Sequence, residues 1–264
     1  MQDRRYLLSL EELLRGEGGE KTVSEKLFIK EELMEQAFSR LDAERQKKVA
    51  VLKDGKKKLQ SMGAGLLLQL AVQEMVRSSD KQTVREEGYG NAGRIRRLNF
   101  AQLLKSLEEP YALEYTYGPK GKPYLKNYPY YVSLSHSEHC VFCVIAEEEV
   151  GADIQYMGSD APGTENDGHK YGKLVQRFFS EEEKREWQLL ESADARRHFF
   201  YRLWCRKEAY GKLTGVGIAE GLGRDMNSLS DHIFEKLLIE DMVLENYQLA
   251  ICKWKKVEGE WRKQ

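Results

Sequence analysis

The chain has 264 residues, and its 42 basic and 43 acidic side chains leave a formal net charge of −1. This length is enough to bury a sizeable core, either as one large domain or as two small ones. The balanced charge gives no global basic field, so any anion site must be local, although neither a nucleic acid nor an acidic partner is excluded.

The N-terminal segment, MQDRRYLLSLEELL, lacks the sustained apolar stretch of a secretory signal. No apolar run in the chain approaches the roughly 20 residues that a membrane-spanning helix needs. We therefore expect a cytoplasmic protein that has no membrane partner. The chain has only four cysteines, which do not make a disulfide framework at this length, so we expect reduced thiols.

The first third of the chain is predicted to be helical. Apolar residues recur at helical spacing over residues 25–52, and a second run, KDGKKKLQSMGAGLLLQLAVQEMV, is basic first and apolar later. Residues 78–97 are polar and contain glycines, which predicts a mobile loop. A short helix is expected in NFAQLLKSLEEP, with Asn99 as its N-cap and Pro110 beyond its end.

The pattern then changes to strands and turns. The segments YALEYTYGPKGKPYL and YVSLSHSEHCVFCVIAEEEVGADIQYM are rich in β-branched and aromatic residues and are broken by glycine and proline. Three helices are predicted next, and a last strand follows in YQLAICKWKKV; the helices cover about 171–178, 180–191 and 193–213. This order fits two α+β half-domains, residues 1–150 and 151–264.

The predicted helix FYRLWCRKEAYGKLTGVGI carries an unusual set of side chains. Trp204, Glu208 and Lys212 are spaced four residues apart and share one face, and Lys207 lies beside it. One interpretation is an amphipathic surface helix with a Glu208–Lys212 ion pair, which is common and weak. The other is a site that handles phosphate.

The strand VGADIQY places Asp153 and Gln155 on the same face. A carboxylate in a buried strand is costly unless it is paired or bound to a metal ion. Together with a distant glutamate, these oxygen ligands suit Mg²⁺, which shares its shell with water and substrate phosphates. The alternative is an aspartate that caps a turn at the end of the sheet.

Three other segments offer anion-binding or nucleophilic groups. The turn YGPKGKPYL combines lysines with exposed backbone, as a nucleotide-binding loop or an ordinary hairpin would. The serines and histidines of SLSHSEHC suggest a hydrolase or a phosphate site, but no G-x-S-x-G motif is present. Cys140 and Cys143 form C-x-x-C without a second pair, so we expect core thiols rather than a zinc or redox site.

The combination of motifs is more specific than any one of them. In chain order the sequence has a basic helix, G-K-P, S-L-S-H-S, V-G-A-D-I, F-F-S with Glu182-Glu183, and W-x-x-K-E-A-x-x-K. This series, over roughly residues 40–220, resembles the 4′-phosphopantetheinyl transferases of the large, Sfp-like type. The resemblance implies a pseudo-dimeric α+β fold, in which two similar half-domains hold the active site in the cleft between them. It places the Trp204–Lys212 helix along that cleft, where Glu208 meets Asp153 from across it.

The resemblance also implies an activity. Such enzymes use Mg²⁺ to move the phosphopantetheine arm of coenzyme A onto a serine of an apo acyl or peptidyl carrier protein, which gives the holo carrier and 3′,5′-ADP. The implied partners are coenzyme A and the carrier, with no nucleic acid, and a monomer is expected to be sufficient. The implied catalytic residues are Asp153, Glu208 as the general base, and Lys212, and the implied metal ligands are Asp153, Glu208 and Gln155. The implied coenzyme A contacts are Lys58 (or Lys57), Gly121, Lys122, Pro123, Ser135, His136, Lys207 and Lys212.

One residue departs from the family pattern. Many members have D-x-E where this chain has Asp153-Ile154-Gln155, so an amide replaces a carboxylate and should weaken Mg²⁺ binding. Two alternatives therefore remain open. One is a catalytically weakened homologue that still binds coenzyme A or a carrier. The other is a different Mg²⁺-dependent phosphodiester enzyme such as a nuclease, which would leave the G-K-P and S-H motifs unexplained.

Overall fold

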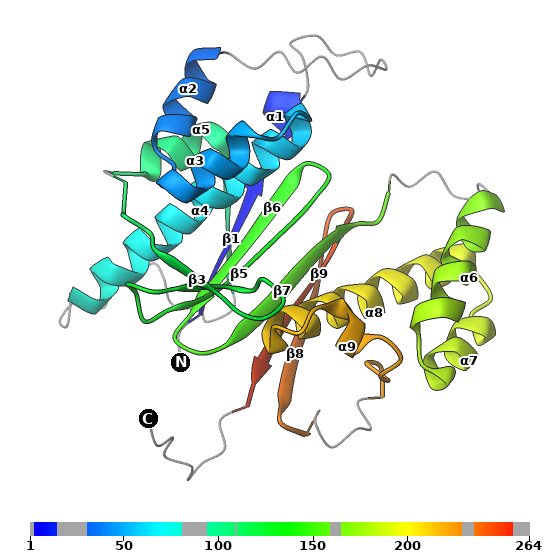
Figure 1. The fold of residues 1–264 in the computed structure, drawn as a ribbon. Coiled ribbons are helices and arrows are strands. Elements are labelled where there is room, and N and C mark those ends of the chain that lie inside the picture. The colour runs from blue at the N-terminus through cyan, green and yellow to red at the C-terminus, as the bar shows by residue number, and fades with distance from the viewer. Residues whose placement is uncertain are drawn as a thin grey trace. The chain divides into compact units, whose positions relative to one another are not determined.

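The computed structural model describes residues 3–14, 31–80, 94–108, 110–158, 165–228 and 235–255. It has the predicted α+β class, with helices and more than one sheet (Figure 1). The chain forms two compact units, Met1–Thr116 with Pro123–Glu147, and Tyr117–Lys122 with Glu148–Gln264. The predicted half-domains 1–150 and 151–264 stay a prediction. No helix in the described parts is long and apolar enough to cross a membrane.

A four-stranded sheet organises the first unit. Its order is β2-β1-β6-β5, in which β1 and β2 are parallel and the other neighbours are antiparallel. The 26-residue helix α4 packs against this sheet, and leucines of α4 fill a core with apolar residues of β1 and β6. The strands are β1 (Asp3–Ser9), β2 (Ile95–Asn99), β5 (Tyr131–Ser137) and β6 (Cys140–Ala146), and α4 spans Gly55–Asp80.

The smaller elements of this unit refine the sequence predictions. The helical run predicted over 25–52 contains two helices, with Asp42 as the N-cap of the second; residues 15–30 lie outside the described part. The predicted helix after Asn99 is confirmed, and Asn99 and Gln102 form a capping box at its start. These elements are α1 (Glu11–Leu14), α2 (Glu31–Ser39), α3 (Ala43–Ala50), α5 (Phe100–Ser106), β3 (Tyr115–Tyr117) and β4 (Pro123–Leu125).

Both ends of the loop predicted over residues 78–97 belong to regular elements instead. Helix α4 continues to Asp80, and β2 begins at Ile95 because it pairs with β1. Residues 81–93 lie outside the described part. Strand β1 was not predicted from the sequence. Its pairing with β2 shows that the C-terminal end of the predicted loop belongs to a strand.

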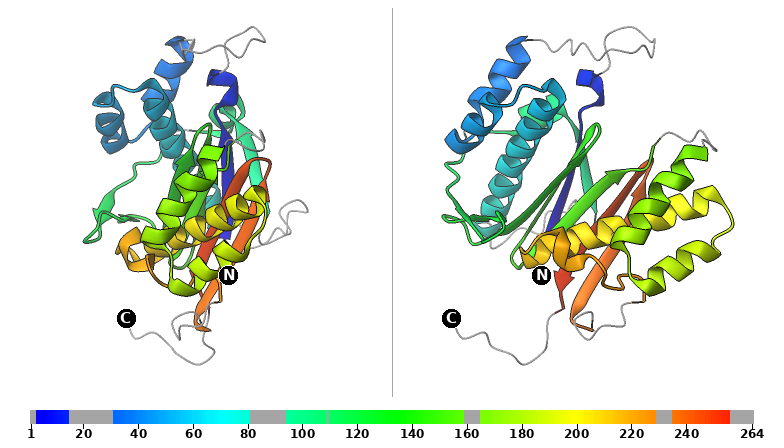
Figure 2. Two further views of the ribbon diagram at one scale, coloured as in Figure 1. Left: turned by 90° about the vertical axis from the view of Figure 1, so that its right-hand side faces the viewer. Right: turned by 45° about the vertical axis from the view of Figure 1, so that its right-hand side comes forward.

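The second unit is built on the antiparallel sheet β7-β9-β8. Helix α8 lies along β7 and β9, as the yellow helix and the green and red strands show (Figure 2). The aromatic ring of Trp204 packs against Phe178 and Phe200, at centroid distances of 5.7 and 5.6 Å, so it joins α8 to α6. The elements are β7 (Val150–Tyr156), α6 (Glu165–Phe178), α7 (Glu181–Leu189), α8 (Ala193–Thr214), α9 (Ile218–Gly221), β8 (Leu237–Leu244) and β9 (Tyr247–Trp254).

Candidate active site

Helix α8 approaches β7 closely because residue 151 is a glycine. A Cβ atom at Gly151 would lie 2.0 Å from the carbonyl oxygen of Ala209 and 2.4 Å from the backbone nitrogen of Leu213. No side chain fits there, so the backbone of α8 rests directly on the strand. This contact brings the last turns of α8 beside the residue two positions further along β7, which is Asp153.

Asp153 is the centre of a small polar cluster. Its side chain is almost completely buried, and both of its oxygens accept hydrogen bonds. The ammonium of Lys212 donates to Oδ1 at 2.8 Å and to the carbonyl oxygen of Ala152 at 3.0 Å. The amide nitrogen of Gln155 donates to Oδ2 at 2.9 Å. Asp153 is therefore paired, as a buried carboxylate must be.

Glu208 is the second carboxylate of the cluster. It lies one turn before Lys212 on α8 and is half-buried. Burial raises the pKa of Glu208, the negative charge of Asp153 raises it further, and Lys212 opposes this shift. The fold thus holds two like charges near each other beside one lysine. Both residues belong to the second unit.

The donor set fits Mg²⁺ in part. Within the described residues, no three histidine, cysteine, aspartate or glutamate side chains gather as a metal-binding group. Mg²⁺ is often held by one or two carboxylates together with water and substrate phosphates, and Asp153 and Glu208 supply such a pair. Gln155 differs from the expectation, because it directs its amide nitrogen at Asp153 and so acts there as a donor.

The G-K-P turn is anchored to the end of α8. Gly121 has a φ of +83°, a conformation that favours glycine, and its nitrogen bonds to the carbonyl oxygen of Gly118 at 2.9 Å. The largely buried ammonium of Lys122 pairs with Glu149 and donates to the carbonyl oxygen of Leu213 at 2.8 Å. A cation at the last carbonyls of a helix is favourable, so Lys122 caps α8, and Pro123 then begins β4.

The residues expected to bind coenzyme A in the first unit lie on β5 and α4. Ser135 is buried and His136 is exposed, because neighbouring residues of a strand face opposite ways. Lys58 is half-buried near the start of α4. Lys56, two residues earlier, forms an ion pair with Glu138.

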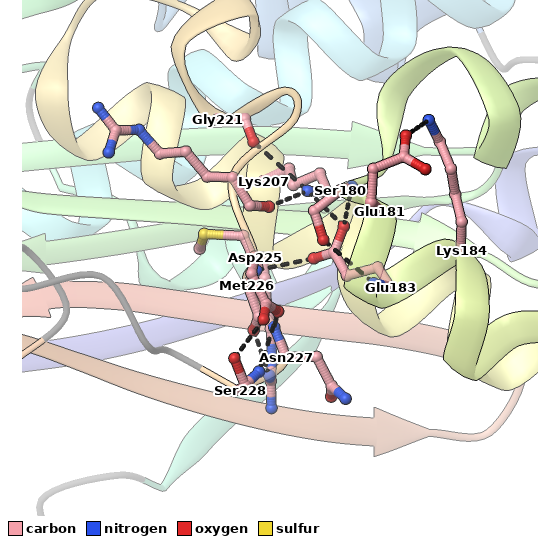
Figure 3. A network of polar contacts seen from close by, with 12 residues as sticks. Ser180, Glu181, Glu183, Lys184, Lys207, Gly221, Asp225, Met226, Asn227 and Ser228 are labelled. Atoms are coloured by element: carbon pink, nitrogen blue, oxygen red, sulfur yellow. Dashed lines mark hydrogen bonds and ion pairs between the residues drawn. The ribbon is translucent and has the colours of Figure 1, made fainter.

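Lys207 is placed differently from the expected phosphate contact. Its side chain is fully buried, and its ammonium lies 2.8 Å from Oε2 of Glu183 (Figure 3). Burial lowers the pKa of Lys207, and the charge of Glu183 opposes the shift. Sequence reasoning assigned no role to Glu183. The Ser180-x-x-Glu183 spacing of a capping box was the available signal, and the structure has that box.

The four cysteines are unbridged and buried, as expected for core thiols. Burial raises the pKa of Cys143 to about 12, which keeps its thiol protonated. Cys205 lies next to the polar cluster, and burial and the charge of Asp153 both raise its pKa. A thiol with a raised pKa is a poor nucleophile, so Cys205 adds no reactive group to the carboxylates and the lysine of the cluster.

The model of the 4′-phosphopantetheinyl transferase superfamily matches residues 149–253, which contain the whole Asp153 cluster. This segment is therefore similar to the 4′-phosphopantetheinyl transferases. A 4′-phosphopantetheinyl transferase of Bacillus pumilus is 30% identical over 151 residues, which are 53% of this chain and 60% of the relative. The transferase AcpT of Escherichia coli is 30% identical over 141 residues, 53% of this chain and 65% of the relative. The transferase HetI of a Nostoc strain is 32% identical over 119 residues, 42% of this chain and 46% of the relative.

The matches leave part of each superfamily relative uncovered. The chain spans between 46% and 65% of the length of these three proteins. Asp153, Gln155, Glu208 and Lys212 all fall inside the matched segment, whereas Lys58, Ser135 and His136 precede the superfamily match. The likeness therefore bears most directly on the polar cluster of the second unit.

Proposed function

We propose that the protein transfers the 4′-phosphopantetheine arm of coenzyme A to a serine of an acyl or peptidyl carrier protein. The observation that carries the proposal is the pairing of Asp153 with Lys212 beside Glu208, inside the segment that matches the superfamily. Two carboxylates and a lysine at the meeting of a strand and a helix form a group suited to phosphoryl transfer.

Each residue of the cluster has a role in this proposal. Glu208 takes the proton of the carrier serine hydroxyl, directly or through a water, and its raised pKa suits it to proton transfer. The serine oxygen bonds to the pantetheine-side phosphorus as the bond from that phosphorus to the bridging oxygen breaks, and 3′,5′-ADP leaves. Lys212 stabilises the negative charge of the phosphates, and Asp153 orients Lys212.

Coenzyme A would also need contacts outside the cluster. The resemblance assigns these to Lys58, Gly121, Pro123, Ser135 and His136. Gly121 and Pro123 would contribute backbone shape, because the turn that they form is anchored through Lys122. We leave Lys207 out of the phosphate contacts, because its ammonium is fully enclosed by protein.

Asp153 and Glu208 would hold the divalent cation of the superfamily. When bound, such an ion supplies positive charge that neutralises the pyrophosphate. Gln155 holds the carboxylate of Asp153 in place for this contact. Asp153 can accept further contacts, since an ionised carboxylate offers about four lone pairs.

Replacing Gln155 by glutamate should strengthen binding of Mg²⁺ or Mn²⁺ by roughly tenfold or more, because a third carboxylate joins Asp153 and Glu208. Without the ion the variant should be less stable than the wild type, since a donor to Asp153 becomes a like charge. Calorimetric titration with each ion and thermal unfolding with and without it measure both effects. Equal metal-ion affinities of the wild type and the variant would show that Gln155 does not lie next to the bound ion.

The function is tested by intact-mass spectrometry of an apo carrier protein incubated with this protein, coenzyme A and Mg²⁺, and with EDTA as the control. A Mg²⁺-dependent gain of one phosphopantetheine supports the proposal. No gain across several carriers, with coenzyme A binding retained, would identify a binding protein that has lost turnover. Loss of coenzyme A binding as well would overturn the proposal.

A further inference from the structure

The buried ion pair between Glu183 and Lys207 is connected to three segments of the second unit (Figure 3). The ammonium of Lys207 also donates to the carbonyl oxygens of Arg224, at 2.6 Å, and Gly221, at 3.4 Å. Its three donors thus have three acceptors. Neither side chain of the pair has any exposed surface.

Glu183 is satisfied as completely as Lys207. Its Oε2 accepts the backbone nitrogen of Ser180 at 2.9 Å, and its Oε1 accepts that of Met226 at 2.7 Å. Glu183 also lies in the first turn of α7, where the helix dipole favours a negative charge. The pair therefore ties the start of α7, the middle of α8 and the segment that follows α9 to one point.

A buried ion pair of this kind adds little net stability to a protein. The free energy lost when two charges leave water offsets much of their attraction. Proteins in which apolar residues replace a buried ion pair are often as stable. What a fully coordinated pair supplies in addition is a unique geometry, because each hydrogen bond fixes a direction. Gly221 adds to this, since a Cβ atom there would lie 3.0 Å from the carbonyl oxygen of Lys207.

The residue that follows Lys207 is Glu208. We propose that Glu183 and Lys207 are positioning residues, which fix the rotation of α8 so that Glu208 and Lys212 face Asp153. The opposite constraint comes from β7, where Gly151 admits the backbone of α8. Held from both sides, α8 cannot turn its carboxylate away from the cluster. This role rests on the proposed transferase function, and it replaces a phosphate contact for Lys207.

Two single variants and their combination test the pair. Glu183→Gln and Lys207→Met each leave one buried charge without its partner, whereas the double variant leaves none. Each single variant should lower kcat for holo-carrier formation roughly 10- to 100-fold, because small misplacements of a catalytic group have large effects. The KM and the calorimetric Kd for coenzyme A should stay within about twofold of the wild type. The double variant should recover most of the lost kcat.

A matched control is available on the same helix. Glu181 and Lys184 of α7 form an ion pair at 2.7 Å in which the Glu181 side chain is 72% exposed (Figure 3). The Lys184 side chain is 17% exposed, so methionine there keeps the packing of its aliphatic part. Glu181→Gln and Lys184→Met should leave kcat and the melting temperature near the wild-type values, since a pair whose carboxylate lies in water contributes little. The comparison separates the effect of the buried pair from that of removing charge in general.

Three results would overturn the positioning role. A raised Kd for coenzyme A in Lys207→Met but not in Glu183→Gln would make Lys207 a ligand contact. Wild-type kcat in folded single variants would make the pair purely structural. A double variant no more active than the worse single variant would show that the two residues do not act as a pair. Failure of the transferase function itself is distinct, because the wild type would then show no transfer in the same assay.

Discussion

Replacing Glu208 by glutamine should lower phosphopantetheine transfer by roughly 10²- to 10⁴-fold, the range expected when a general base is removed. The substitution keeps the shape of the side chain but leaves it unable to accept a proton. Intact-mass measurement of holo-carrier formation over time gives the rate. Full activity in this variant would contradict the assignment of Glu208 as the base.

The same substitution should not unfold the protein. Burial and Asp153 raise the pKa of Glu208, so the fold disfavours its carboxylate form and a neutral amide removes that cost. The melting temperature should stay at the wild-type value or rise slightly. Glu182→Gln is the control, because Glu182 is exposed on α7 and pairs only with Arg185 among the described contacts. It should change neither rate nor stability.

Replacing Gly151 by alanine should destabilise the second unit more than an ordinary core substitution does. The new Cβ would lie 2.0 Å from a backbone oxygen of α8, and backbone cannot move aside as a flexible side chain can. Overpacking typically costs 1–3 kcal/mol, and we expect about 3 kcal/mol or more here. For a folded unit of about 150–250 residues, a loss of about 3 kcal/mol lowers the melting temperature by roughly 6–12 °C.

Gly172→Ala is the matched control for Gly151. A Cβ atom there would meet only the ring of Trp187, at 3.4 Å, which is an ordinary contact. Since Gly172 lies inside α6, alanine should be neutral or stabilising by about 0.5–1 kcal/mol. Differential scanning calorimetry compares both variants with the wild type. A wild-type melting temperature for Gly151→Ala would mean that α8 does not rest on β7 as closely as described.

Local sequence patterns predicted the elements whose signals are contained within one segment. The Asn99 capping box marks the start of α5, and the four-residue spacing of Trp204, Glu208 and Lys212 identifies α8. The alternation of β7 put Asp153 and Gln155 on one face, and their hydrogen bond confirms this. These predictions needed only the periods of helices and strands.

Features that depend on distant partners were not predicted. Strand β1 pairs with β2 and β6, which lie far along the chain, and its own sequence has no clear alternation. The orientation of Lys207 is similar. Its helical position suggested a side chain beside the active face, but its acceptors come from Glu183, Gly221 and Arg224. The spacing of residues within one segment does not indicate contacts with residues far along the chain.

The anchored G-K-P turn has a consequence for any attempt to divide the protein. The chain passes between the two units three times, since Tyr117–Lys122 group with the second unit while the residues on both sides belong to the first. A fragment that begins at Glu148 would lose Lys122, and with it the partner of Glu149 and a donor to the carbonyl oxygen of Leu213. The second unit is thus discontinuous in sequence, and a simple truncation cannot produce it intact.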